Sequence, residues 1–366
     1  MYRIITTTCL ALLLISGLRA QEDSTYFDDE EFNFDDYDFA DGAAKTFCSN
    51  KIVGLSPSQF ISLGYDWQGP YDIAFSPVNA AEGYQPGDEI NRESTRVLST
   101  HGLRFSANVP VYSRNSLVIQ LGANFWDLRY QFENPDQLTN PVAQEISEHG
   151  LRTAGLNTTI FKPLNDKHFI LFQGSADLNG DYALNEFQSL SYLRYSAAAL
   201  FGWRTSDYKQ WGLGVARTYR VGELNYIPIV LFNWTSKSSN WGTEILFPAR
   251  GHVRYTFNAR NMAFFGYELE GQSYRINDYS EDELNDQSLE IRRGEMRWRF
   301  MWQRQLTGFI WLQLQAGWRY NWSFDADVLP EGREFFRGFF GDQPFAMLNQ
   351  MGNPLYANVS INLVSP

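Results

Sequence analysis

The sequence predicts an all-β fold: a transmembrane, antiparallel, up-and-down β-barrel of about 14 strands that follows a disordered acidic N-terminal tail. Apolar and polar residues alternate with period two from residue 59 onward. This alternation is typical of β-strands that have one apolar and one polar face. Short turns alternate with long polar connections, as in membrane barrels. Aromatic residues make up 16% of the 366 residues, yet mean hydropathy is -0.36. This combination is typical of neither disordered chains nor helical membrane proteins.

Residues 1–20 are predicted to be a secretory signal peptide. Arg3 precedes an apolar stretch that ends at Leu18, and cleavage is expected near the small residue Ala20. The apolar stretch is only about half as long as a membrane-spanning helix requires. The mature chain then keeps Cys48 as its single cysteine, which excludes an internal disulfide and a cysteine-based metal site.

Residues 21–46 form an acidic segment that cannot bury a core. The segment has ten Asp or Glu and six Phe or Tyr against one Lys, and it lacks Leu, Ile and Val. We therefore expect a flexible periplasmic tail or plug over residues 21–54. The alternative is that residues 21–46 dock a periplasmic protein partner. With 30 basic and 42 acidic residues and no basic stripe, a nucleic-acid partner is not expected.

The barrel itself is predicted over residues 55–366. Every even position between Phe309 and Trp322 is apolar or aromatic, whereas the odd positions from Gln313 onward are Gln, Gly, Arg or Asn. Similar small and polar residues occupy one face of the other segments, as in a water-lined barrel interior. We expect strands at 59–68, 100–110, 115–126, 149–161, 168–178, 190–203, 211–220, 226–235, 241–247, 250–258, 262–274, 288–302, 309–322 and 354–365.

The connections between these strands support the same topology. An even strand number leaves both ends of the barrel on the periplasmic side. One ambiguity lies at Pro248, which marks either a tight outer turn or a bend in one long strand. A bend would leave thirteen strands, an odd number that is unusual for such barrels, so we expect fourteen and keep twelve as the alternative count. The long polar connections are expected at 70–99, 127–148, 179–189, 275–287 and 323–353.

Aromatic residues flank the short turns in pairs and predict a girdle at one membrane interface, in contact with outer-membrane lipid. The pairs are Phe161 with Phe169, Trp203 with Trp211, Trp234 with Trp241, and Trp302 with Phe309.

Charged residues occupy inward positions of several strands. By alternation, the residues that line the lumen are Arg104, Arg194, Arg254, Glu268, Glu270, Glu295, Arg297, Arg299 and Arg319. Two interpretations stay open: a ladder of ion pairs that fills the interior, and the lining of a pore. Barrels of eight strands are filled by side chains and barrels of sixteen hold a channel, so about 14 strands predict a narrow or plugged lumen.

Three segments carry a resemblance to a known family: LSPSQFISLGYDWQG (55–69), WGTEILFPARGHVRYTFNARN (241–261) and the final alternating strand. They resemble an uncharacterised family of Gram-negative outer-membrane β-barrel proteins over about residues 55–366. The resemblance implies an outer-membrane location and a barrel fold, without an activity. The Trp-to-Pro element in 241–261 is also similar to one in barrels linked to uptake of aromatic compounds.

The sequence predicts no enzyme, no cofactor and no metal site. Ser147, Glu148 and His149 are adjacent, but neighbouring residues of a strand face opposite sides, which is a poor geometry for a catalytic triad. The acidic residues within 278–286 lack the spacing and the glycine of a calcium-binding loop. The remaining histidines fall at strand ends or turns and are His101, His168 and His252.

The function expected from these observations is a porin-like channel or facilitator for passive passage of small solutes, located in the outer membrane of a Gram-negative bacterium. In this hypothesis the acidic tail folds into the arginine-bearing lumen as a plug. The alternative is a structural or scaffolding barrel that recruits a periplasmic partner through residues 21–46. The third hypothesis is an outer-membrane hydrolase.

Overall fold

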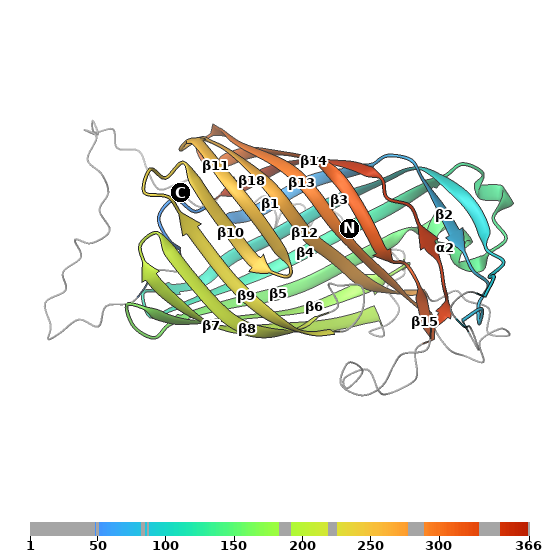
Figure 1. Ribbon diagram of the computed structural model, residues 1–366, viewed down its shortest axis with the longest axis horizontal. Helices are drawn as coiled ribbons and strands as arrows, with labels where there is room; N and C mark the ends of the chain where they lie inside the picture. Colours follow the sequence, from blue (N-terminus) through green and yellow to red (C-terminus); the bar gives the residue numbers. More distant parts are fainter. Residues whose placement is uncertain are drawn as a thin grey trace, which may run out of the picture. The chain divides into compact units, whose positions relative to one another are not determined.

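The computed structural model describes residues 48, 51–81, 85, 88–182, 192–218, 225–276, 289–328 and 345–364. The predicted signal peptide and the acidic residues 21–46 lie outside these ranges. The described residues belong to one compact unit, Thr46–Pro366, which forms a β-barrel (Figure 1). No helix in the described ranges is long and apolar enough to cross a membrane.

Fourteen of the eighteen strands in the described sheet form the barrel wall. Each wall strand pairs antiparallel with the next, and β1 closes the ring because it pairs with both β3 and β18. The wall strands are β1 (Gln59–Gln68), β3 (Glu93–Arg114), β4 (Leu117–Phe132), β5 (Leu151–Pro163), β6 (His168–Gly180), β7 (Leu193–Ser206), β8 (Lys209–Thr218), β9 (Asn225–Thr235), β10 (Trp241–Phe247), β11 (Arg250–Asn258), β12 (Asn261–Ile276), β13 (Leu289–Thr307), β14 (Ile310–Ser323) and β18 (Leu355–Val364).

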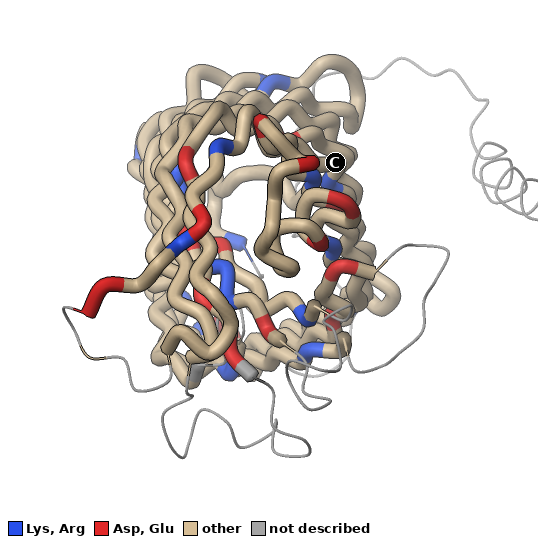
Figure 2. Tube along the Cα trace, turned by 90° about the vertical axis from the view of Figure 1, so that its right-hand side faces the viewer, with Lys and Arg blue, Asp and Glu red and all other residues tan. Residues whose placement is uncertain are grey.

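The predicted fold class and the count of 14 strands are therefore confirmed. The alternative of twelve strands is excluded, because β10 and β11 pair with each other on either side of a tight turn at Pro248. Seen end-on, the wall is a closed ring of strands (Figure 2).

Alternation along the strands directs large apolar side chains outward. The exposed fraction reaches 68% at Leu156, 62% at Phe265 and 67% at Leu355. An apolar surface of this extent is costly in water and matches the hydrocarbon-facing band of membrane barrels.

Five of the eight residues predicted for the aromatic girdle lie at outward positions of the wall strands, and they are Trp203, Trp211, Trp234, Trp241 and Trp302. Phe309 lies in the turn before β14, and the prediction is wrong for Phe161 and Phe169. These two side chains are only 7% and 2% exposed and pack inside the barrel against Leu200. The outward face of β5 and β6 runs through Leu156 and Ile170, so the odd positions of both strands face inward. Closeness to a turn therefore does not decide which face an aromatic residue occupies.

The two ends of the barrel differ in construction. The short turns other than the one at Pro248, the start of β1 and the end of β18 lie at one end, which we call the turn end. The opposite end, the loop end, carries η1 (Pro135–Gln137), α2 (Pro141–His149) and four short strands, which are β2 (Tyr71–Phe75), β15 (Ala326–Val328), β16 (Phe345–Met347) and β17 (Gln350–Met351) (Figure 1).

Helix α2 occupies a stretch that was expected to be part of a long loop. Asn140 caps its first turn by accepting hydrogen bonds from two backbone N–H groups, and Pro141 takes the first helical position. Gly150 ends the helix with φ 68, a conformation that favours glycine. His149, which the strand pattern had placed at the start of β5, is consequently the last helical residue.

An apolar cluster fills the interior at the loop end. It includes Ile73 from β2, Leu128 from β4, Ile146 from α2 and Met347 from β16, none more than 1% exposed. The described elements therefore cover this end with a packed core rather than leaving an open mouth.

Strand β12 extends beyond β11 at the same end, while it stays paired with β13. Its Arg275 pairs in parallel with Gly180 of β6, and Gln272 accepts a hydrogen bond from Asn179 at 3.0 Å. This contact bypasses β7 to β11. The loop end is thus enclosed by fewer strands than the turn end, which explains why side chains can fill it.

Candidate functional site

A polar cavity of about 660 Å³ lies inside the barrel, in the half next to the turn end. Every wall strand except β7 contributes to its lining. This volume is within the range of roughly 300–1,000 Å³ that small-molecule sites occupy. The lining is rich in amide and hydroxyl groups, which suits water or a polar solute.

Residues 51–58, which we call the strap, cross the turn end of the barrel. Backbone hydrogen bonds hold this region to two turns: Cys48 N–H donates to Asn165 O at 2.9 Å and Val53 N–H donates to Asp207 O at 2.8 Å. Cys48 is 5% exposed and packs with the inward Phe161 and Phe169. The strap is therefore part of the barrel interior and not a free continuation of the tail.

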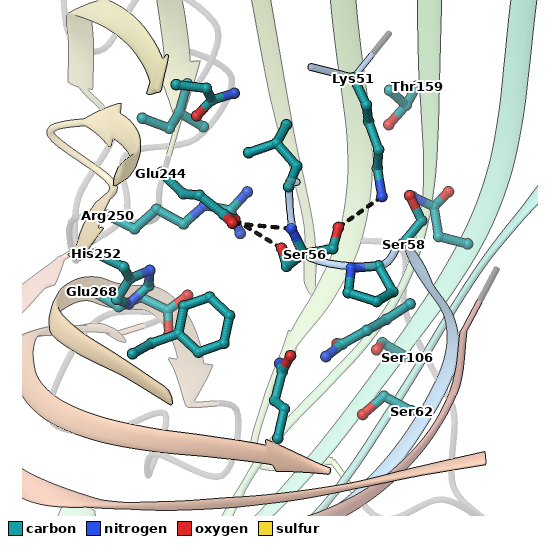
Figure 3. A pocket seen from close by; sticks show the side chains of 18 of the residues that line it. Lys51, Ser56, Ser58, Ser62, Ser106, Thr159, Glu244, Arg250, His252 and Glu268 are labelled. Carbon is teal, nitrogen blue, oxygen red and sulfur yellow. Dashed lines mark hydrogen bonds between the residues drawn. The ribbon is translucent and has the colours of Figure 1, made fainter. Parts of the chain in front are cut away.

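The Glu244 carboxylate fastens the middle of the strap. Ser56 donates its backbone N–H to Oε1 at 3.1 Å and its hydroxyl to Oε2 at 2.8 Å (Figure 3). Glu244 is itself held by Arg254, whose guanidinium is fully buried and donates to Oε1 at 2.7 Å. We call the Ser56–Glu244–Arg254 chain the latch.

Gly54 allows the strap to lie close to the wall beneath the latch. Its φ is +75, and a Cβ at this position would meet Thr235 Cγ2 at 2.9 Å. Any other residue would be strained in this backbone conformation and would push against the wall.

The strap separates two spaces. A second cavity, of about 540 Å³, is lined by the turn-end residues Gly308 and Phe309 and by the strap. Both cavities share the strap residues Lys51, Leu55, Pro57 and Ser58. Displacement of the strap would therefore join the inner cavity to the space at the turn end.

Burial also affects the charge of the strap. Desolvation lowers the pKa of the Lys51 ammonium to about 8, although the nearby Glu244 carboxylate opposes this shift. In the docked strap, Lys51 therefore loses its proton at a lower pH than a solvent-exposed lysine, whose pKa is about 10.4.

An arginine–carboxylate layer lies between the polar cavity and the apolar cluster. The fully buried Glu295 contacts three guanidinium groups, those of Arg297 at 2.6 Å, Arg293 at 2.8 Å and Arg319 at 3.2 Å. Arg297 also contacts Glu270 at 2.6 Å. Buried charges of this kind need several partners to offset their desolvation.

The layer continues across the barrel through Arg104. This guanidinium contacts Glu270 at 2.6 Å and Asp66 of β1 at 3.0 Å, and it lies over the Trp126 ring at 4.2 Å. The ion pairs therefore connect strands on both sides of the β1–β18 junction.

The structure places all nine residues of the predicted lumen set in the interior, but in separate groups. Arg104, Glu270, Glu295, Arg297 and Arg319 share the layer, while Glu268 pairs with Arg299 at 2.5 Å. Arg254 belongs to the latch. Arg194 pairs with Glu290 at 3.0 Å near the loop end.

Sequence reasoning missed several residues of these groups. Asp66 and Arg293 follow the same inward alternation as their neighbours and could have been found by it. The latch could not have been found from the sequence, because Ser56 and Glu244 lie 188 positions apart and the strap has no strand periodicity.

Three histidine rings have polar side-chain partners in the described structure. His149 pairs with Glu145 at 2.9 Å, His168 with Asn165 at 3.0 Å and His252 with Arg299 at 3.2 Å, and none of these partners is a serine, threonine or cysteine. His101 stacks on Tyr65 on the outward face. Among the described residues, no three His, Cys, Asp or Glu side chains form a group that could hold a metal ion.

Comparison with known proteins identifies a family. A family profile with the description "Domain of unknown function (DUF6268)" matches residues 80–318, a range that runs from before β3 into β14. No curated protein matches the chain in sequence.

Solved structures with similarity to the chain include three membrane channels. The NanC porin is 11% identical, with 81% of this chain and 100% of that chain covered and a TM-score of 0.33. An outer membrane channel from Pseudomonas putida F1 is 10% identical, with 89% and 100% covered and a TM-score of 0.35. The deltaS2 mutant of the TodX monoaromatic hydrocarbon channel is 9% identical, with 86% and 92% covered and a TM-score of 0.31.

The Glu295→Gln variant should be markedly less stable than the wild type. The substitution removes the carboxylate charge that three buried arginines share, and loss of one partner of a buried pair costs about 3–5 kcal/mol. The free energy of unfolding, measured by urea titration in micelles, should fall accordingly. Glu89→Gln, in an exposed loop, is the control. Equal stability of both variants would contradict a central role for Glu295.

The Ser56→Ala variant should expose Cys48 to thiol reagents. It removes a hydrogen bond to a carboxylate, worth about 1.5–3 kcal/mol, and so weakens strap docking. We expect maleimide labelling of Cys48 to accelerate by about tenfold or more. Ser58→Ala, which changes a strap hydroxyl without a hydrogen bond to the described residues, should label at the wild-type rate. Identical rates in both variants would show that the latch does not hold the strap.

Proposed function

This chain belongs to the DUF6268 family, and we propose that it is an outer-membrane channel for small polar solutes, with a gate at its periplasmic end formed by the strap.

The polar cavity is the observation that carries the proposal. A barrel that served only as a scaffold would gain stability from side chains that fill its interior, as they do at the loop end. The space of about 660 Å³ is instead lined by hydroxyls, amides and charges from nearly the whole ring. Such a lining is typical of water-filled lumens.

The strap supplies the gate. It lies between the inner cavity and the space at the turn end, and its middle is held by one carboxylate. Opening of this gate would require loss of the latch hydrogen bonds, of the backbone hydrogen bond from Val53 to Asp207 and of the Cys48 packing. Passage through the whole barrel also requires the loop-end cover to move.

The outward surface supports the location. Outward positions carry exposed Leu, Phe and Trp side chains, and closed barrels are one of only two architectures that satisfy backbone groups in lipid. The even number of wall strands and the strap at the turn end are consistent with a periplasmic turn end.

A sealed barrel is the second candidate function, and the apolar cluster at the loop end favours it. In that case residues 21–46, which lie outside the described structure, would recruit a periplasmic partner. Passage of solute distinguishes the two functions, because a channel requires the loop-end cover to move.

Planar-bilayer recordings of the mature protein test the proposal. We expect discrete current steps, and their open probability should increase by about tenfold or more in Ser56→Ala, since the lost hydrogen bond holds the strap. In the absence of added sugar, Ser58→Ala should keep the open probability of the wild type. Absence of current from all three folded proteins would refute the channel and favour the sealed barrel.

Opening should also depend on pH through Lys51. Since its pKa is about 8 when the strap is docked and about 10.4 when it is released, the docked state binds fewer protons between these values. Docking therefore strengthens as pH rises from 8 to 10, and open probability should fall roughly tenfold. Lys51→Met should lose most of this dependence, whereas Lys237→Met should retain it. The same pH profile in both variants would exclude Lys51 as the cause.

A further inference from the structure

Positively charged side chains outnumber negatively charged ones in the lining of the polar cavity. Two carboxylates line it, and both already bind arginines: Glu244 binds Arg254 and Glu268 binds Arg299. Four cationic side chains line it, which are Lys51, Arg104, Arg250 and Arg299. The cavity therefore has an excess of positive charge.

Arg250 differs from the other cations in that its side chain makes no hydrogen bond or close ion pair with the described residues, although the Glu268 carboxylate interacts with it electrostatically. Arg104 contacts Asp66 and Glu270, Arg299 contacts Glu268, and Lys51 donates to Ser56 O at 2.8 Å. Arg250 lies at an inward position of β11, opposite Glu268 in the strand register. Its guanidinium keeps its donors for an anion.

Hydroxyl groups gather on another part of the cavity wall. Figure 3 shows Ser58, Ser62, Ser106 and Thr159 on one side and Arg250 beside Glu244 on the other. These four hydroxyls make no hydrogen bond with the described protein residues. They come from the strap, β1, β3 and β5, whereas Arg250 comes from β11.

We propose that this cavity binds a small anion that carries several hydroxyl groups, such as a sugar acid. The carboxylate of the ligand pairs with Arg250, and its hydroxyls bond the serine and threonine side chains across the cavity. This inference rests on the proposed function, since it names the class of solute that the channel would accept. It also assigns Arg250 as the residue that selects charge.

Calorimetric titration of the mature protein in micelles with D-glucuronate and D-glucose tests the site. The two sugars share their ring and most hydroxyls and differ in the carboxylate. We expect glucuronate to bind about tenfold or more tightly than glucose, because charge-assisted hydrogen bonds are roughly twice as strong as neutral ones. Equal affinity for the two sugars would overturn the proposal.

Variants separate the two halves of the site. Arg250→Gln should lower glucuronate affinity to that of glucose and leave glucose binding unchanged. The double variant Ser62→Ala/Ser106→Ala should weaken both sugars. Arg217→Gln makes the same change on the outward face of β8 and should bind as the wild type. Unchanged glucuronate affinity in Arg250→Gln would overturn the assignment of this residue.

Bilayer recordings in a KCl gradient complete the test. An anion-selective reversal potential that shifts toward zero in Arg250→Gln would support the inference. Current steps without anion selectivity and without glucuronate binding would refute the anion site and leave the channel intact. Tight glucuronate binding without any current would support the site and refute the channel.

Discussion

Closure of the strand ladder is the constraint on which the rest of this structure depends. A barrel wall in lipid has to satisfy every backbone group within the ring, and here β1 achieves this by pairing with both β3 and β18. A ring of 14 strands is too wide to be filled by apolar side chains along its whole length. The interior is consequently occupied differently along the barrel axis. A polar cavity lies near the turn end, an arginine–carboxylate layer follows it, and an apolar cluster fills the loop end.

The change in ring size explains the order of these layers. Where β12 contacts β6 through Arg275 and Gly180, the enclosed section narrows, and apolar residues from α2, β2 and β16 complete a core. Where the full ring persists, the cross-section is bridged by long side chains such as Arg104 and Arg297. Their charges are offset by the carboxylates of Asp66, Glu270 and Glu295. Near the turn end, neither the apolar core nor the arginine–carboxylate layer fills the interior. A cavity remains there, and the strap covers it.

The sequence predicted the wall well because strand alternation is a local property. The bounds of β1, β10 and β11 coincide with the expected ranges, and the inward charges follow from the same period. Features set by distant contacts could not be predicted. Phe161 was assigned from its closeness to a turn although its face depends on strand register, and the link between Ser56 and Glu244 joins segments that share no local pattern. Helix α2 could have been predicted in part from the sequence, because Asn140, Pro141 and Gly150 are recognisable residues of helix ends.

The position of the strap in the chain also fixes the sequence of events during assembly. Residues 51–58 directly precede β1, yet their partners Asp207 and Glu244 belong to the middle of the barrel. The strap therefore reaches its final place only after β7 to β11 have been added to the growing sheet. The N-terminal strand β1 can complete its pairing in the wall only when β18 is present. The N-terminal edge of this barrel thus depends on later parts of the chain for two separate contacts: β18 completes the wall, and the turn and strand that hold Asp207 and Glu244 fix the strap.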